Sequence, residues 1–264
     1  MDPRARSLLA DQAGVVARRQ LLAVGLVDHD IARLGRRREL VAVHRGVYVD
    51  HTGPLPWVQR AWAGVLFAWP AALCHDSALC TAGGSDVADV TDPLVHVAIA
   101  GSRRVREPAG VRIRRMIDFE RRVLWNLGPP RIRYEEAVVD VASAARSNLA
   151  ALGVLSRAVQ QRRTTAARLL ETVSARDRVA RRAWLVSVLS DVAEGACSVL
   201  EQGYLVRVER AHGLARARRQ VASLTRGGGT YRDVEYDGGL VVELDGRSST
   251  TRRSSATGTS TATW

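Results

Sequence analysis

The chain has 264 residues, of which 46% are hydrophobic, and a formal net charge of +12 at pH 7. This length fits one large domain or two to three smaller ones with a real hydrophobic core, so disorder throughout the chain is excluded. All 39 basic residues are arginine. Codon usage in a GC-rich genome accounts for part of that excess, but the resulting positive field still attracts polyanions and favours nucleic acid as a partner.

Hydropathy and cysteine spacing point to the cytoplasm. The most apolar stretch, residues 57–74, contains a glutamine, an arginine and a proline, so neither a membrane-spanning helix nor a membrane partner is predicted. The apolar run near the start of the chain is too short for a signal peptide. Cys74, Cys80 and Cys197 have no C-x-x-C spacing, which predicts reduced thiols rather than disulfides or a structural zinc site.

Residues 1–52 are predicted to form a winged helix-turn-helix. Apolar spacing and stop signals predict helices at 7–12, 15–24 and 31–36, with Asp28 capping the third and Gly25 ending the second. Two β-branched runs at 40–43 and 47–49 follow, joined by His44-Arg45-Gly46, and predict a hairpin. In such a module the third helix enters the major groove and the wing touches phosphates.

Arginines stand at both of these positions. Arg33, Arg36, Arg37 and Arg38 line or follow the third helix, and Arg45 lies at the tip of the hairpin. They are the predicted DNA-binding residues. The alternative is that an arginine run closing a helix is solvated and complements the helix dipole.

The phrases at 17–25 (ARRQLLAVG) and 40–48 (LVAVHRGVY) resemble the N-terminal winged-helix domain of abortive-infection type IV antitoxins. The resemblance covers about fifty residues. It implies a DNA-binding regulatory module and, for an antitoxin, a cognate toxin as a further partner.

Residues 53–190 are predicted to form a mixed α/β middle domain. Helical spacing covers 57–79, 136–144, 148–159 and 179–189, the last reaching towards Val208, and β-like runs lie at 94–100 and 111–116. His75-Asp76-Ser77 carries the residue types of a hydrolase triad, but no G-x-S-x-G elbow surrounds Ser77. Serine hydrolysis is therefore not predicted.

Residues 191–247 carry the acidic residues that suggest chemistry. Glu201 falls in a predicted helix, Asp233 opens a predicted strand, and Glu243 and Asp245 lie in the run LVVELDG. Alternation along a strand places Glu243 and Asp245 on one face. Carboxylates this close repel each other unless a cation intervenes, which predicts Mg²⁺ held by Asp233 and Glu243. The alternative is a solvent-facing acidic edge.

The order of these residues resembles the very-short-patch-repair-like endonucleases, which have a restriction-endonuclease core. The resemblance covers about residues 194–247 and implies a Mg²⁺-dependent DNA endonuclease domain. By this resemblance Asp233, Glu243 and Asp245 are catalytic and Glu201 supports them. Arg219 and Arg232 would hold phosphates.

Two departures from that family mark the domain as incomplete. Asp245 stands where a lysine is frequent, and Thr250 stands where the family usually has a histidine. Residues 248–264 form a low-complexity tail rich in Ser and Thr, predicted to be disordered, where another helix and strand are expected. We expect a frameshifted or truncated nuclease domain.

The sequence thus predicts an α+β protein with three parts and a tail, and leaves two functions open. The first is DNA binding joined to a nuclease-like domain that truncation inactivates. The second is a non-enzymatic, antitoxin-like transcriptional regulator. An RNA partner also stays open.

Overall fold

The computed structural model describes residues 2–83, 94–193, 208, 212–214, 218–225, 228–236 and 240–242. These residues form a mixed α+β fold, as the sequence predicts, with three separate β-sheets. The chain divides into two compact units, Met1–Asp140 and Val141–Trp264. No helix among the described residues is long and apolar enough to cross a membrane.

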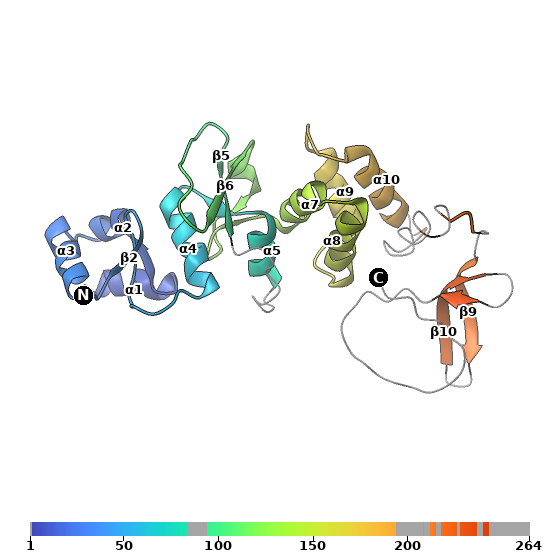
Figure 1. The fold of residues 1–264 in the computed structure, drawn as a ribbon, viewed down its shortest axis with the longest axis horizontal. Helices are drawn as coiled ribbons and strands as arrows, with labels where there is room; N and C mark the ends of the chain where they lie inside the picture. The colour runs from blue at the N-terminus through green and yellow to red at the C-terminus, as the bar shows by residue number, and fades with distance from the viewer. Residues whose placement is uncertain are drawn as a thin grey trace. The chain divides into compact units, whose positions relative to one another are not determined.

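The first unit contains two sheets and six complete α-helices within its described residues, and a further helix, α7, crosses its boundary at Asp140 (Figure 1). Its elements, in chain order, are α1 (Pro3–Asp11), β1 (Val15–Ala17), α2 (Arg18–Ala23), α3 (Asp28–Arg36), β2 (Val41–His44), β3 (Val47–Val49), α4 (Trp57–Ala68), β4 (Ala72–Leu73), α5 (His75–Gly83), β5 (Val95–Ala100), β6 (Val111–Met116), α6 (Phe119–Arg122), β7 (Val123–Leu124), β8 (Arg131–Ile132) and α7 (Tyr134–Ala144).

The N-terminal sheet corrects one predicted helix. Residues 15–24 do not form a single helix, because Val15–Ala17 is strand β1 and only Arg18–Ala23 is helical. All three β1 residues are buried and pair antiparallel with β3, giving the order β1-β3-β2. β-Branched residues suit a strand packed on both sides. Gly14 precedes β1 at φ +85°, where a Cβ atom would lie 2.5 Å from Asp50 Oδ1.

The predicted ends of α2 and α3 are largely correct. Gly25 has φ +99° and ends α2, with Gly25 N donating to Leu22 O and Leu26 N donating to Leu21 O. At the start of α2, Ala17 N donates to the Gln20 side-chain oxygen at 2.9 Å. Asp28 is the first residue of α3 rather than its cap, because the N-cap position is Val27.

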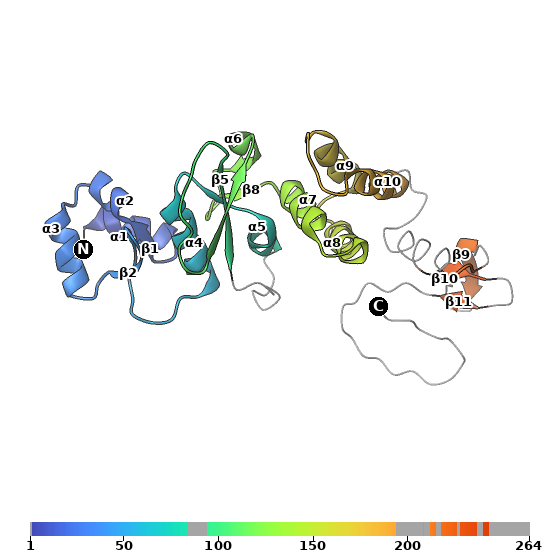
Figure 2. The same ribbon diagram turned by 45° about the horizontal axis from the view of Figure 1, so that its top comes forward.

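A five-stranded sheet with the order β6-β5-β4-β8-β7 forms the second half of this unit. Helix α4 covers one of its faces and α5 the other, as Figures 1 and 2 both show. Val95 and Val97 of β5 face α4, since their side chains lie 3.3–3.4 Å from the Cβ position of Gly64. By strand alternation the intervening His96 faces α5.

The helix predicted over residues 57–79 is in fact three elements. Helix α4 ends at Ala68, β4 follows at Ala72–Leu73, and α5 begins at His75. Pro70 explains the break, because the residue before a proline is disfavoured in helical conformation. Trp69 is accordingly extended, with φ −43° and ψ 140°.

The second unit begins with helices and continues with a small antiparallel sheet. The predicted helices are confirmed as α8 (Asn148–Gln160) and α10 (Arg182–Ala193), while α9 (Ala166–Ser174) was not predicted. Ser147 and Thr165 cap α8 and α9 by accepting from Ala150 N and Arg168 N. The sheet has the order β11-β10-β9, with β9 (Arg218–Thr225), β10 (Gly228–Glu235) and β11 (Val241–Val242).

Candidate nucleic-acid interface

Helix α3 presents three polar side chains opposite its buried face. Ile31 and Leu34 are buried and pack in a cluster with α1 and α2. Because successive residues turn by about 100° around a helix, His29, Arg33 and Arg36 lie on the side away from these two residues. All three are exposed. The buried residues thus pack α3 against the core, and the opposite face is open to solvent.

Salt bridges divide the positive charges of this region into paired and unpaired groups. Arg33 pairs with Asp30 at 2.9 Å on the same helix, and Arg37 lies 3.9 Å from Glu39. Arg36 and Arg38 make no ion pair with the described residues, and both are exposed. Their charges are therefore available to an external anion.

Arg18 joins the β2–β3 turn to the start of α3. Its backbone N donates to Gly46 O in the turn at 2.8 Å. Its guanidinium pairs with the Asp28 carboxylate, with Nε at 2.9 Å from Oδ1. The turn therefore lies beside α2, and its exposed Arg45 is held in the same module as α3.

The predicted residues of the nuclease-like domain fall largely beyond the described part of the chain. Glu201, Glu243 and Asp245 lie outside the described residues. The backbone of Asp233 is within β10, which begins at Gly228, so the predicted start of a strand at Asp233 is wrong. Arg232 of β10 pairs with Val221, and Arg219 of β9 pairs with Val234. The two predicted arginines therefore lie on adjacent strands.

Two residues of the α3 surface were missed by sequence analysis. His29 lies on the outer face, and its helical spacing from Arg33 is a signal that was present in the sequence. Arg18 was missed because its role depends on Asp28, ten residues away, and on a backbone oxygen of the turn. No sequence pattern indicates that contact.

Comparisons with known proteins add little to this geometry. No protein-family model matches the chain, and no curated protein matches it. Among solved structures, the crystal structure of the RV2827C protein from Mycobacterium tuberculosis aligns with a TM-score of 0.42 and 20% identity, over 70% of this chain and 75% of that chain. A likeness of this size carries no functional argument.

Proposed function

We propose that this is a cytoplasmic DNA-binding protein whose residues 1–52 act as a winged helix-turn-helix. The observation that carries the proposal is the exposed face of α3, with His29, Arg33 and Arg36 opposite its buried residues. In this module α3 is the helix that enters the major groove, and the β2–β3 turn with Arg45 is the wing.

The chemistry of these side chains fits that role. An arginine donates two hydrogen bonds to the O6 and N7 atoms of guanine, or a charged contact to a phosphate. The carboxylates of the first turn of α3 do not oppose DNA strongly, because Asp28 and Asp30 are paired with Arg18 and Arg33. Arg36, Arg38 and Arg45 then supply the positive charge of the surface.

Substitution of the α3 arginines tests the proposal. Fluorescence anisotropy with labelled mixed-sequence duplexes, and with duplexes selected from a random pool, gives the affinity. We expect Arg33→Ala with Arg36→Ala to weaken binding to the selected duplex by roughly 10-fold or more, because each base contact contributes about 1–3 kcal/mol. Arg157→Ala is the matched control, since Arg157 is also exposed in the last turn of a helix, α8. Equal losses in the control and the double variant would refute an interface on α3.

Arg38 offers a variant that separates binding from folding. Arg38 follows α3 at φ +58°, in the left-handed region that glycine adopts without strain. Arg38→Gly should keep or raise the free energy of unfolding, by up to about 1 kcal/mol. It should also weaken DNA binding and lower the log–log salt slope by about 0.9, as expected for one lost phosphate contact. Unchanged affinity and slope would remove Arg38 from the interface.

Metal-dependent cleavage of bound DNA is a second candidate, favoured by the pairing of β10 with β11. Val234 pairs with Val242. Asp233 directly precedes Val234 in the chain, and Glu243, beyond the described residues, directly follows Val242. Carboxylate oxygens are the ligands that Mg²⁺ takes in proteins. Asp233 and Glu243 would hold this ion, with Asp245 and Glu201 assisting, and bound Mg²⁺ supplies charge neutralisation at a phosphodiester.

A cleavage assay distinguishes this nuclease from a regulator. Plasmid and linear duplex are incubated with the full chain in Mg²⁺, Mn²⁺ or EDTA. A nuclease should lose cleavage in EDTA and in Asp233→Asn and Glu243→Ala, but keep its affinity for DNA. Glu171→Gln, which removes an exposed carboxylate of α9, should cleave normally. Intact DNA in every condition, with binding retained, favours the antitoxin-like regulator and its cognate toxin.

A further inference from the structure

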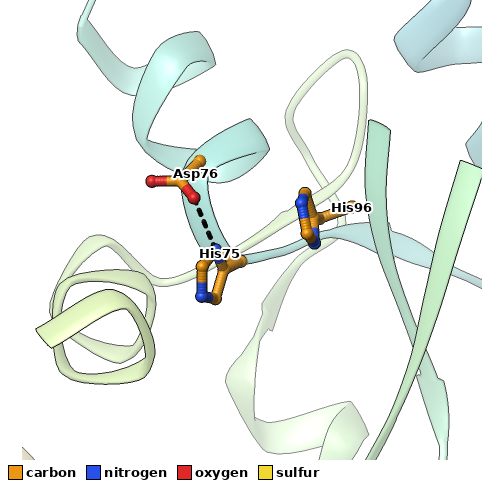
Figure 3. A group of neighbouring side chains, drawn as sticks. All are labelled: His75, Asp76 and His96. Carbon is orange, nitrogen blue, oxygen red and sulfur yellow. Dashed lines mark hydrogen bonds and ion pairs between the residues drawn. The ribbon is translucent and has the colours of Figure 1, made fainter. Parts of the chain in front are cut away.

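A group of three metal-binding side chains lies in the first unit, away from the α3 surface. It consists of His75 and Asp76, the first two residues of α5, and His96 of β5 (Figure 3). Each side chain offers one ligand atom, and the three atoms lie within 4.8 Å of one another. Neither DNA binding by α3 nor the candidate cleavage site in β10 involves these residues.

The fold brings the three residues together through the sheet. His96 faces α5 and is buried, with 4% exposure. Cys74 N donates to His96 O at 3.0 Å, and His96 N donates to Ser77 Oγ at 2.9 Å. These bonds fix the start of α5 against β5. The imidazoles of His75 and His96 consequently stack, with ring centroids 4.9 Å apart and planes inclined by 24°.

The ring of His75 and the carboxylate of Asp76 already face each other. His75 Nδ1 lies 2.6 Å from Asp76 Oδ2, and a metal ion bound by both groups would displace the proton between them. Neutral imidazole is the commonest side-chain ligand of metal ions. The second ring nitrogen, Nε2, is buried and has no hydrogen-bond partner among the described residues.

His75, at the start of α5, has a left-handed backbone with φ +52°. This conformation accompanies a ring stacked on His96 and beside the carboxylate of Asp76.

We propose that His75, Asp76 and His96 bind one divalent transition-metal ion of the Zn²⁺ type. Two imidazoles and a carboxylate form a common three-ligand set for such ions, with a fourth position for water. Ligand atoms about 2.1 Å from a tetrahedral ion lie roughly 3.4 Å apart, so rotations of these side chains close the site. Solvent can reach the proposed site at Asp76, because 40% of the Asp76 side chain is exposed.

Arg114 gives the proposal a distinctive test. Its Nε donates to His96 Nδ1 at 3.3 Å, so a guanidinium cation lies beside the proposed ion. Repulsion between these charges weakens metal binding. Removal of this charge in Arg114→Gln should therefore strengthen metal binding by at least about threefold. A merely structural histidine pair predicts no gain.

The experiment uses the full chain, freed of metal with EDTA and desalted. Calorimetry with Zn²⁺ and the visible absorption of bound Co²⁺ measure affinity and ligand geometry. We expect one ion per chain. His75→Gln, His96→Gln and Asp76→Asn should each weaken binding by at least about 100-fold, since even outer-shell substitutions cost 10–100-fold. His51→Gln is the control, because His51 is another partly exposed imidazole in the same unit.

Circular dichroism and the thermal midpoint of each metal-free variant exclude unfolding as the cause of a loss. If His96→Gln fails to fold, Asp76→Asn and Arg114→Gln decide, because both positions are accessible to solvent. Absence of binding, or equal binding by the three ligand variants and His51→Gln, overturns the proposal. In that outcome the group is a stacked, hydrogen-bonded histidine pair without a metal.

Discussion

His44 shows how the surroundings of one side chain make stability depend on pH. It ends β2 and is half-buried, with its ring edge against Phe67 at a centroid distance of 5.5 Å. Burial lowers the pKa of His44 below its ordinary value of 6.5. The unfolded chain therefore binds a proton more readily than the folded chain. The resulting stabilisation is present above about pH 6.5 and is lost as the pH falls towards the folded-state pKa.

We expect urea unfolding in EDTA buffer to give a lower free energy of unfolding at about pH 5 than at about pH 7. In His44→Gln this decrease should be smaller, because the group that titrates is gone. Arg45→Gln, at the next position, should keep the decrease of the original chain. A pH dependence that is identical in His44→Gln would show that burial of His44 does not contribute.

Arg18 and Arg19 illustrate what residue types alone cannot predict. Arg18 pairs with Asp28 within the N-terminal module. Arg19 instead donates to Leu66 O at 2.7 Å, and its guanidinium lies 5.4 Å from the centre of the Trp69 ring. The sequence places two adjacent arginines at the start of a helix. Their separate roles depend on partners at distant positions in the chain.

At the scale of elements, the sequence predicted the helices and strands whose apolar residues follow one periodicity throughout. Helix α3 and strands β2 and β3 were predicted near their observed bounds. The exposed arginines of α3 could be predicted for the same reason, since apolar Ile31 and Leu34 define its buried face.

The elements that sequence analysis missed are short and packed on several sides. Strand β1 has three residues, all buried, and its apolar residues run directly into α2. Strand β4 has two residues and lies between two helices. Periodicity cannot separate a short buried strand from a helix. The His75, Asp76 and His96 group depends on this: without β4 beside β5, residues 75 and 96 have no reason to meet.

At the scale of the first unit, α4 joins the two sheets into one packed body. One side of α4 contributes Trp62, Ala63 and Leu66 to a cluster with β1 and β3. Its other side contributes Ala61, Val65 and Ala68 to the core of the five-stranded sheet. Polar contacts add to this packing, because Gln59 Nε2 donates to Ala13 O at 2.8 Å. The proposed DNA-binding module therefore shares its core with the sheet that carries His96.

Leu66→Ala tests whether this shared core makes the first unit unfold cooperatively. Leu66 is buried, with 1% exposure, so its truncation should lower the free energy of unfolding by about 2–5 kcal/mol. Hydrogen exchange measured by mass spectrometry should then accelerate in peptides from both β3 and β5, because opening one sheet exposes the helix that covers the other. Leu22→Ala is the control, since Leu22 is 37% exposed and lies outside this cluster. Faster exchange in β3 with β5 unchanged would mean that the N-terminal module opens independently of the sheet.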